Sequence, residues 1–227
     1  SQANDAVYLL NRQKKKQKTF FYSLTVTDEP TLQNVVFIDF EAYLNEQTVI
    51  PSEFGAVRCI NGKVVAEMHC FLQPSTYELQ FMAQKQNQSI LQKVQNLTGI
   101  HLNKVPHMLP QNEFGRIFDQ FCICDWDQLL QLKSDNIKVM VYGQFLQQDH
   151  CDVFAQGKQL EELLLKRFKS CSAFFVREVH TCFEFGREKA HKDREFQYCD
   201  YHQGCKGEHC ALDDARYMAA CAMAGGQ

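Results

Sequence analysis

Three apolar segments of strand length follow one another in the first third of the chain. They cover residues 35–41, 51–60 and 63–72. Asn61 and Gly62 separate the second from the third, and an Asn-Gly pair between two apolar-patterned segments is the strongest short-range signal for a β-hairpin. The first segment is a continuous apolar run that ends in two acidic residues. The pattern therefore predicts three consecutive antiparallel strands.

Helical and strand-like patterns alternate through the rest of the chain. Apolar residues at helical spacing predict four helices, over residues 79–95, 113–133, 149–168 and 210–223. Short apolar runs predict two more strands, at residues 137–142 and 173–176. The highly charged stretch 183–197 predicts an exposed loop, and a glycine pair ends the last helix. This order predicts an α/β protein with a mixed β-sheet, a three-strand antiparallel meander and helices on both faces.

The N-terminal residues differ from the rest. We expect residues 1–33 to form a basic arm and residues 34–227 to form one domain, since 227 residues suffice for one large core. A basic run at residues 12–18 is followed by aromatic and apolar residues at 19–26. Such a run is either a solvated arm or a surface that contacts nucleic-acid phosphates.

Composition narrows the classes of function. The chain is 45% hydrophobic and 22% charged, as globular proteins are, and its net charge of −3 provides no overall attraction for nucleic acid. No apolar run approaches the roughly 20 residues that span a bilayer, and no signal segment opens the chain, so we expect no membrane partner. Eleven cysteines, mostly among apolar residues, indicate buried thiols in a reducing intracellular compartment, the cytoplasm or the nucleus.

Acidic residues at the end of the first strand are candidates for metal binding. Asp39 and Glu41 stand two residues apart, so both carboxylates leave the same face of the strand. The two carboxylates repel each other, and a bound Mg²⁺ or Mn²⁺ ion would neutralise that repulsion. Enzymes that catalyse phosphoryl transfer often use two such ions, about 4 Å apart. A third acid would begin the helix after strand 137–142, with Asp152 favoured and Asp149 the alternative. The plainer interpretation is a strand that ends in solvent.

The start of the last predicted helix adds two candidates. Asp214 would complete a four-carboxylate cluster, and Asp213 is its neighbouring alternative, because only one of the two can face the same site. Histidine titrates near neutral pH, so His209 is a candidate acceptor for the proton of an attacking water.

A second cluster in the same region suits a different metal. Cys199, His202 and Cys210 have the spacing of ligands for a tetrahedral zinc ion, and such a site needs a fourth ligand. Residues close in sequence that could supply it are Cys205, Glu208 and His209. The alternative is that the cysteines only pack in the core while His202 is exposed.

These acids resemble a known family. The match is to the three motifs of the DEDDh exonucleases, a DnaQ-type family of RNase H-like fold: Asp39-Phe-Glu41, a later helix-borne aspartate, and the segment from His209 to Asp214. The turn at residues 97–100 resembles one that this family often carries. The resemblance extends over residues 35–226, although the His-Asn pair that usually precedes the third acid is absent. It implies removal of nucleotides from 3′ ends, with His209 as general base and two metal ions held by Asp39, Glu41, Asp152 and Asp214.

A second resemblance concerns the zinc ligands. Residues 51–57, together with the Cys/His/Cys spacing, are similar to the Maelstrom domain of the piRNA pathway, and the exonuclease domain of arenavirus nucleoproteins is similar in carrying both sites. The resemblance implies a structural zinc ion, RNA and silencing-pathway proteins as partners, and four zinc ligands: Glu53, Cys199, His202 and Cys210. Animal Maelstrom domains have lost most of the DEDDh residues, whereas this chain carries both sets.

The leading hypothesis is a metal-dependent 3′-5′ exoribonuclease, active on single-stranded RNA and potentially on DNA. One alternative is a non-catalytic RNA-binding or scaffold module in which the acids are relics. The other is a metal-independent endonuclease for single-stranded RNA.

Overall fold

The computed structural model describes residues 33–44, 48–170, 176–179, 196–204 and 209–224. Seven strands of this described part form one sheet in the order β4-β3-β2-β1-β6-β7, and β5 pairs with β3 as well. The strands are β1 (Asn34–Leu44), β2 (Val49–Ile60), β3 (Lys63–Gln73), β4 (Leu109–Pro110), β5 (Lys138–Val141), β6 (Asp152–Ala155) and β7 (Val176–Glu178).

The predicted meander is confirmed. β1 pairs antiparallel with β2, and β2 pairs antiparallel with β3. Asn61 and Gly62 connect β2 to β3 with positive φ angles of 50° and 71°, the left-handed conformation that a tight hairpin requires. β6 lies parallel to β1 on its other side, and β7 lies parallel to β6. The sheet is therefore mixed, as predicted.

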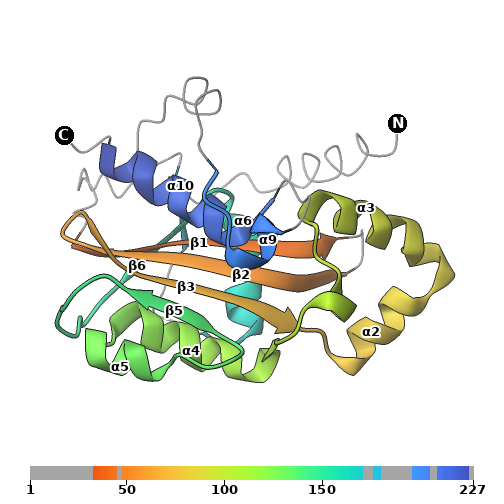
Figure 1. Cartoon of the computed structure of the whole chain (residues 1–227), viewed down its shortest axis with the longest axis horizontal. Helices are drawn as coiled ribbons and strands as arrows, with labels where there is room; N and C mark the ends of the chain where they lie inside the picture. The colour runs from red at the N-terminus through yellow and green to blue at the C-terminus, as the bar shows by residue number, and fades with distance from the viewer. Residues whose placement is uncertain (1–32, 45–47, 171–175, 180–195, 205–208, 225–227) are drawn as a thin grey trace, which may run out of the picture.

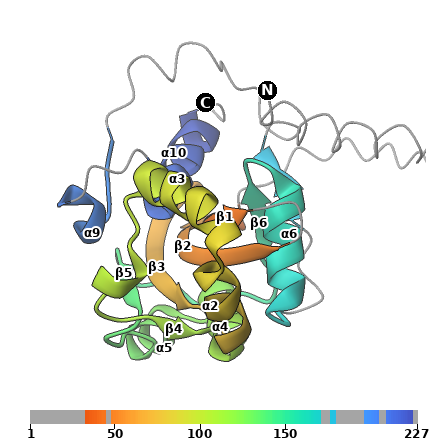
Figure 2. The same ribbon diagram turned by 90° about the vertical axis from the view of Figure 1, so that its right-hand side faces the viewer.

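Helices cover both faces of the sheet, as predicted (Figures 1 and 2). They are α2 (Thr76–Ala83), α3 (Gln88–Thr98), α4 (Gln111–Ile123), α5 (Trp126–Gln131), α6 (Lys158–Arg167), α9 (Asp200–Gln203) and α10 (Ala211–Ala224), with 3₁₀ turns η1 (Lys85–Asn87) and η2 (Leu102–Lys104). Alternate residues of β1 enter different cores: Ile38 packs with residues of α4 and α6, and Phe37 packs with residues of α10. The first turn of α10 thus lies over the face from which Asp39 and Glu41 project.

The predicted helix over residues 149–168 is wrong in its first part. Residues 152–155 form the buried strand β6, and α6 begins only at Lys158, after Gly157. The apolar run Val153 to Ala155 fills a central position beside β1, and burial on both sides favours a strand there. The cause of the error is that a short apolar run fits a buried strand and a helix equally well.

Other boundaries differ less. The predicted helix 113–133 is divided into α4 and α5 by Asp125, whose side chain caps α5 by accepting the N–H of Gln128. The helix 79–95 is likewise divided, into α2 and α3. The strand 137–142 and the helix 210–223 are confirmed as β5 and α10.

Several predicted features lie wholly or partly outside the described residues. The basic arm lies there apart from Gln33, which precedes β1, and so do residues 173–175 of a predicted strand and residues 183–195 of the charged loop. Among the described ranges, no helix combines the length and apolar character that crossing a bilayer requires.

Candidate active site and zinc centre

The C-terminal half of β1 and the start of α10 bring three potential metal ligands together. One ligand atom from each of Glu41, His209 and Asp214 lies within 4.8 Å of the other two. Glu41 is half-buried on β1, Asp214 belongs to the first turn of α10, and the exposed His209 stands two residues before that helix. Residues about 170 positions apart in the chain thus share one site.

Asp39, half-buried two residues before Glu41 on β1, lies beside this group. Burial raises its pKa well above the ordinary value of 3.8, and the neighbouring carboxylates of Asp214, Glu41 and Glu161 raise it further. Burial, followed by the charges of Glu53 and Asp214, raises the pKa of Glu41 to about 8. Neighbouring carboxyl groups with raised pKa values do not readily ionise at the same time. A bound divalent cation stabilises their ionised forms.

Glu161 is the acid that the sequence reasoning missed. It lies on α6, is 4% exposed, and its Oε2 atom accepts no hydrogen bond from any residue that the structure describes. Burial raises its pKa to about 7. A signal was present in the sequence: Glu161 stands beside Leu160 and one turn before Leu164, so it interrupts the apolar face of a helix that follows a buried strand.

Asp152 does not lie where the sequence predicted it. It begins strand β6, not a helix, and its register partner is Val35, four residues before Asp39 on β1. At about 3.3 Å per strand residue, this places Asp152 roughly 13 Å from Asp39 along the sheet. It faces His150 instead, with Nε2 and Oδ1 3.4 Å apart. The alternative, Asp149, is exposed in the preceding loop.

Asp213 and Asp214 have separate surroundings. The buried Asp213 carboxylate accepts a hydrogen bond from the backbone N–H of Gln197. Asp214 lies beside Glu41 and His209. Only Asp214 therefore belongs to the acidic group.

A glycine permits the approach of α10 to the sheet at this point. Gly55 is the register partner of Asp39 on β2. A Cβ atom at Gly55 would lie 2.3 Å from the backbone nitrogen of Leu212 and 2.4 Å from the carbonyl carbon of Ala211. Only a residue without a side chain lets the first turn of α10 rest on β2 beside the acids.

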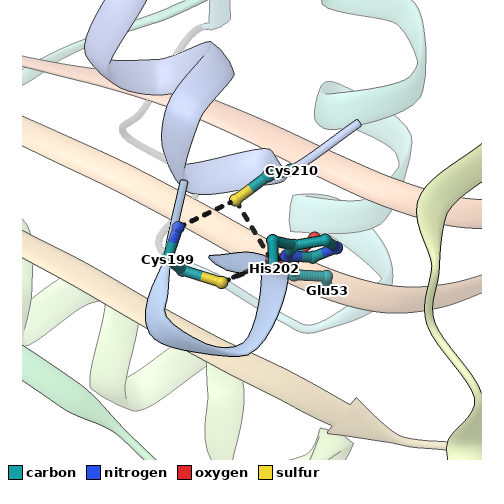
Figure 3. Close-up of side chains that lie close together, drawn as sticks. All are labelled: Glu53, Cys199, His202 and Cys210. Carbon is teal, nitrogen blue, oxygen red and sulfur yellow. Dashed lines mark hydrogen bonds and ion pairs between the residues drawn. The ribbon is translucent and has the colours of Figure 1, made fainter. Parts of the chain in front are cut away.

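The second cluster is the one that the zinc motif predicted (Figure 3). Its four residues, all buried, point toward one another from β2 and from the segment before α10: Glu53, Cys199, His202 and Cys210. Glu53 Oε1 lies 3.8 Å from Cys199 Sγ, 3.7 Å from Cys210 Sγ and 3.3 Å from His202 Nδ1. A tetrahedral zinc ion, with bonds of about 2.3 Å to sulfur and about 2.1 Å to nitrogen or oxygen, separates its ligand atoms by roughly 3.3–3.8 Å. The four residues therefore fit zinc.

Hydrogen bonds orient the ligands of this cluster. His202 Nε2 lies 2.7 Å from the carbonyl oxygen of Thr98, which leaves Nδ1 directed at the other three residues. Burial opposes the charge on Glu53, yet hydrogen bonds from His202 and His69 lower its pKa to about 2. Burial also opposes the charge on His202, but its bonds with Cys210 and Glu53 raise its pKa to about 11. Cys205 and Glu208, the other candidate ligands, lie outside the described residues.

Helix α9 also forms hydrogen bonds with the turn that follows α3. The hydroxyl of Tyr201 donates to the carbonyl oxygen of Gly99 at 3.2 Å and accepts from the N–H of His101 at 3.4 Å. Tyr43, at the end of β1, donates to the carbonyl oxygen of Ile100 at 3.0 Å. The segment that carries Cys199 and His202 thus contacts both α10 and the turn that follows α3.

Comparison with known proteins yields structural likeness only. No protein-family model matches the chain, and no curated protein matches it. One similar solved structure is E. coli Exonuclease I in complex with a 5cy-dA13 oligonucleotide, with 11% sequence identity and a TM-score of 0.43. Another is the zinc-ion-bound form of the E. coli ExoI–ssDNA complex, with 10% identity and a TM-score of 0.45. Each comparison covers 83% of this chain, which spans 39% of the length of the Exonuclease I chain.

Proposed function

We propose that this domain is a metal-dependent 3′-5′ exonuclease that acts on single-stranded RNA. The observation that carries the proposal is the convergence of Glu41, His209 and Asp214 within 4.8 Å, beside the half-buried Asp39 and the buried Glu161. Metal-dependent hydrolysis of a phosphodiester needs carboxylates that bind the metal ions and a nearby group that accepts a proton from water.

The acids would hold two Mg²⁺ or Mn²⁺ ions through Asp39, Glu41, Glu161 and Asp214. Such ions supply Lewis-acid stabilisation to the attacking and leaving oxygens of a phosphoryl transfer. Two observations support this assignment: Oε2 of Glu161 has no hydrogen-bond partner among the described residues, and the pKa values of Asp39 and Glu41 are raised. Oxygen ligands suit these hard cations. Under this proposal Glu161 takes the place of Asp152 as the third acid.

The remaining residues have roles that follow from their places. His209 is exposed, so its ring can reach a water molecule in the open side of the site and accept its proton. Glu53, Cys199, His202 and Cys210 would hold one structural zinc ion, which fixes the segment that leads into α10 and Asp214.

The preference for RNA and the setting in a silencing pathway rest on the resemblance to the Maelstrom domain. Under the proposal, silencing-pathway proteins are partners, the domain works in the cytoplasm or the nucleus, and single-stranded DNA is a secondary substrate. A side-by-side digestion of RNA and DNA of one sequence tests the preference.

The test is digestion of 5′-end-labelled single-stranded RNA with Mn²⁺ added or omitted. We expect a ladder that shortens from the 3′ end only with the metal, and its loss in Asp39→Asn. Asp127→Asn, an exposed acid on α5, is the matched control and should digest normally. Undiminished Mn²⁺-dependent digestion by Asp39→Asn would contradict the proposal. Internal cuts without metal would support the endonuclease, and RNA binding without any cleavage would support the scaffold module.

A further inference from the structure

His69 forms a buried pair with one of the zinc ligands. Its Nε2 atom lies 2.7 Å from Oε1 of Glu53, and the two side chains are 6% and 0% exposed. His69 belongs to β3 and Glu53 to the neighbouring strand β2. His69 is not one of the four residues whose ligand atoms converge. His69 therefore contacts Glu53, a candidate ligand, without being a member of the cluster itself.

Both partners are held in defined orientations. An ionised carboxylate only accepts hydrogen bonds, so the N–H of the pair belongs to His69 Nε2. The His69 ring packs edge-on against Phe71, with centroids 5.0 Å apart at 86°. The other oxygen of Glu53, Oε2, accepts the backbone N–H of Ala211 at 3.2 Å. Glu53 is thereby fixed at both oxygens.

We infer that His69 is a positioning residue of the zinc centre. By donating to Oε1, it holds the Glu53 carboxylate in the rotamer that directs this oxygen at Cys199, His202 and Cys210. The same rotamer directs Oε2 at the first residue of α10. The inference rests on the proposed zinc site and goes beyond it, since it assigns a residue outside the four ligands. Donors that orient a metal ligand in this way typically contribute 10- to 100-fold in metal affinity.

The experiment measures zinc affinity, by titration of the purified full chain against a chromophoric zinc chelator. Two variants of similar length separate hydrogen bonding from packing: His69→Met removes the donor, and His69→Gln keeps an N–H group. We expect His69→Met to bind zinc about 10- to 100-fold more weakly and His69→Gln to stay within about threefold of the wild type. The control is His107→Met, an exposed histidine in the loop before β4, with unchanged affinity.

Two results would overturn the inference: wild-type affinity in His69→Met, or equal losses in the Met and Gln variants. If His69→Met does not fold, His69→Gln alone decides, since its affinity must remain near that of the wild type. Absorption of the Co²⁺-substituted protein is a second readout, because loss of the Glu53 ligand changes the tetrahedral spectrum.

Cys199→Ser separates this inference from the zinc proposal. Zinc binding that survives in Cys199→Ser would refute the site itself. Zinc binding lost in Cys199→Ser but unchanged in His69→Met would refute only the role of His69.

Discussion

Glu53 on β2 and Ala211 at the start of α10 are joined by a hydrogen bond of 3.2 Å from the Ala211 N–H to Glu53 Oε2. The other oxygen of the same carboxylate faces Cys199, His202 and Cys210. One side chain thus links the zinc cluster to the helix that carries Asp214. The two candidate sites are mechanically connected, so a change in one should be measurable in the other.

Loss of a zinc ligand should lower both the zinc content and the stability of the protein. In Cys199→Ser we expect the bound zinc to fall from about one ion per chain to near zero, and the free energy of unfolding to fall by roughly 3 kcal/mol or more, because metal binding is coupled to folding. Elemental analysis and urea denaturation measure the two effects. Cys124→Ser, a half-buried cysteine packed against the other core, is the control. Full stability in zinc-free protein would contradict the structural role.

A side chain at Gly55 should displace α10. Gly55→Ala places a methyl group 2.3 Å from the Leu212 backbone nitrogen, so the helix must move away from Asp39. We expect a loss of roughly 2–3 kcal/mol in stability and at least tenfold weaker Mn²⁺ binding by calorimetry. Gly157→Ala is the matched control, because a Cβ there meets no atom within 4 Å among the described residues. Equal behaviour of the two variants would show that close contact at Gly55 is unimportant.

Glu161 and Asp152 can be compared directly as candidates for the third acid. Glu161→Gln should weaken Mn²⁺ binding at least tenfold and abolish Mn²⁺-dependent digestion of RNA. Asp152→Asn should leave both near the wild-type level, because Asp152 lies at the other end of the β1–β6 pair. Calorimetric titration and a digestion assay at fixed Mn²⁺ measure the outcome. A reversed result would restore the assignment made from sequence.

The acidic site should make stability depend on pH when no Mg²⁺ or Mn²⁺ is added. The folded-state pKa values of Glu41, about 8, and Glu161, about 7, exceed the ordinary 4.5, so the folded state binds more protons than the unfolded state in this window. Stability must therefore fall as pH rises from about 4.5 toward 8.

Glu161→Gln isolates the contribution of one carboxyl group to this pH dependence. We expect the variant to be more stable than the wild type by about 3 kcal/mol at pH 8 and by almost nothing at pH 4.5, because Gln does not ionise. Added Mn²⁺ should abolish the gain. Urea denaturation across the pH range measures it, and parallel curves for the two proteins would refute the raised pKa.

The site was only partly predictable. Position on a helix indicates that only one of Asp213 and Asp214 can face the site, and the structure places these two neighbours in separate surroundings. The third acid could not be located in the same way. The short run Val153 to Ala155 suits a helix or a buried strand, and the helix interpretation directed attention to Asp152 and away from Glu161 on α6.

Local chemistry is what the sequence by itself determined. The Asn61-Gly62 turn and its two apolar flanks specify a hairpin, and the Cys199/His202/Cys210 spacing indicates three neighbouring candidate ligands, because both depend on short stretches of chain. Only the tertiary structure decided which distant groups join them. Glu53 Oε1 lies 3.8 Å from Cys199 Sγ across 146 positions of the chain. Helix α6 packs beside β1, where the charge of Glu161 helps to raise the pKa of Asp39. Long-range proximity of this kind depends on the register of the strands and on where the helices pack. Both are determined by the whole core, so the spacing of residues within a short segment does not reveal them.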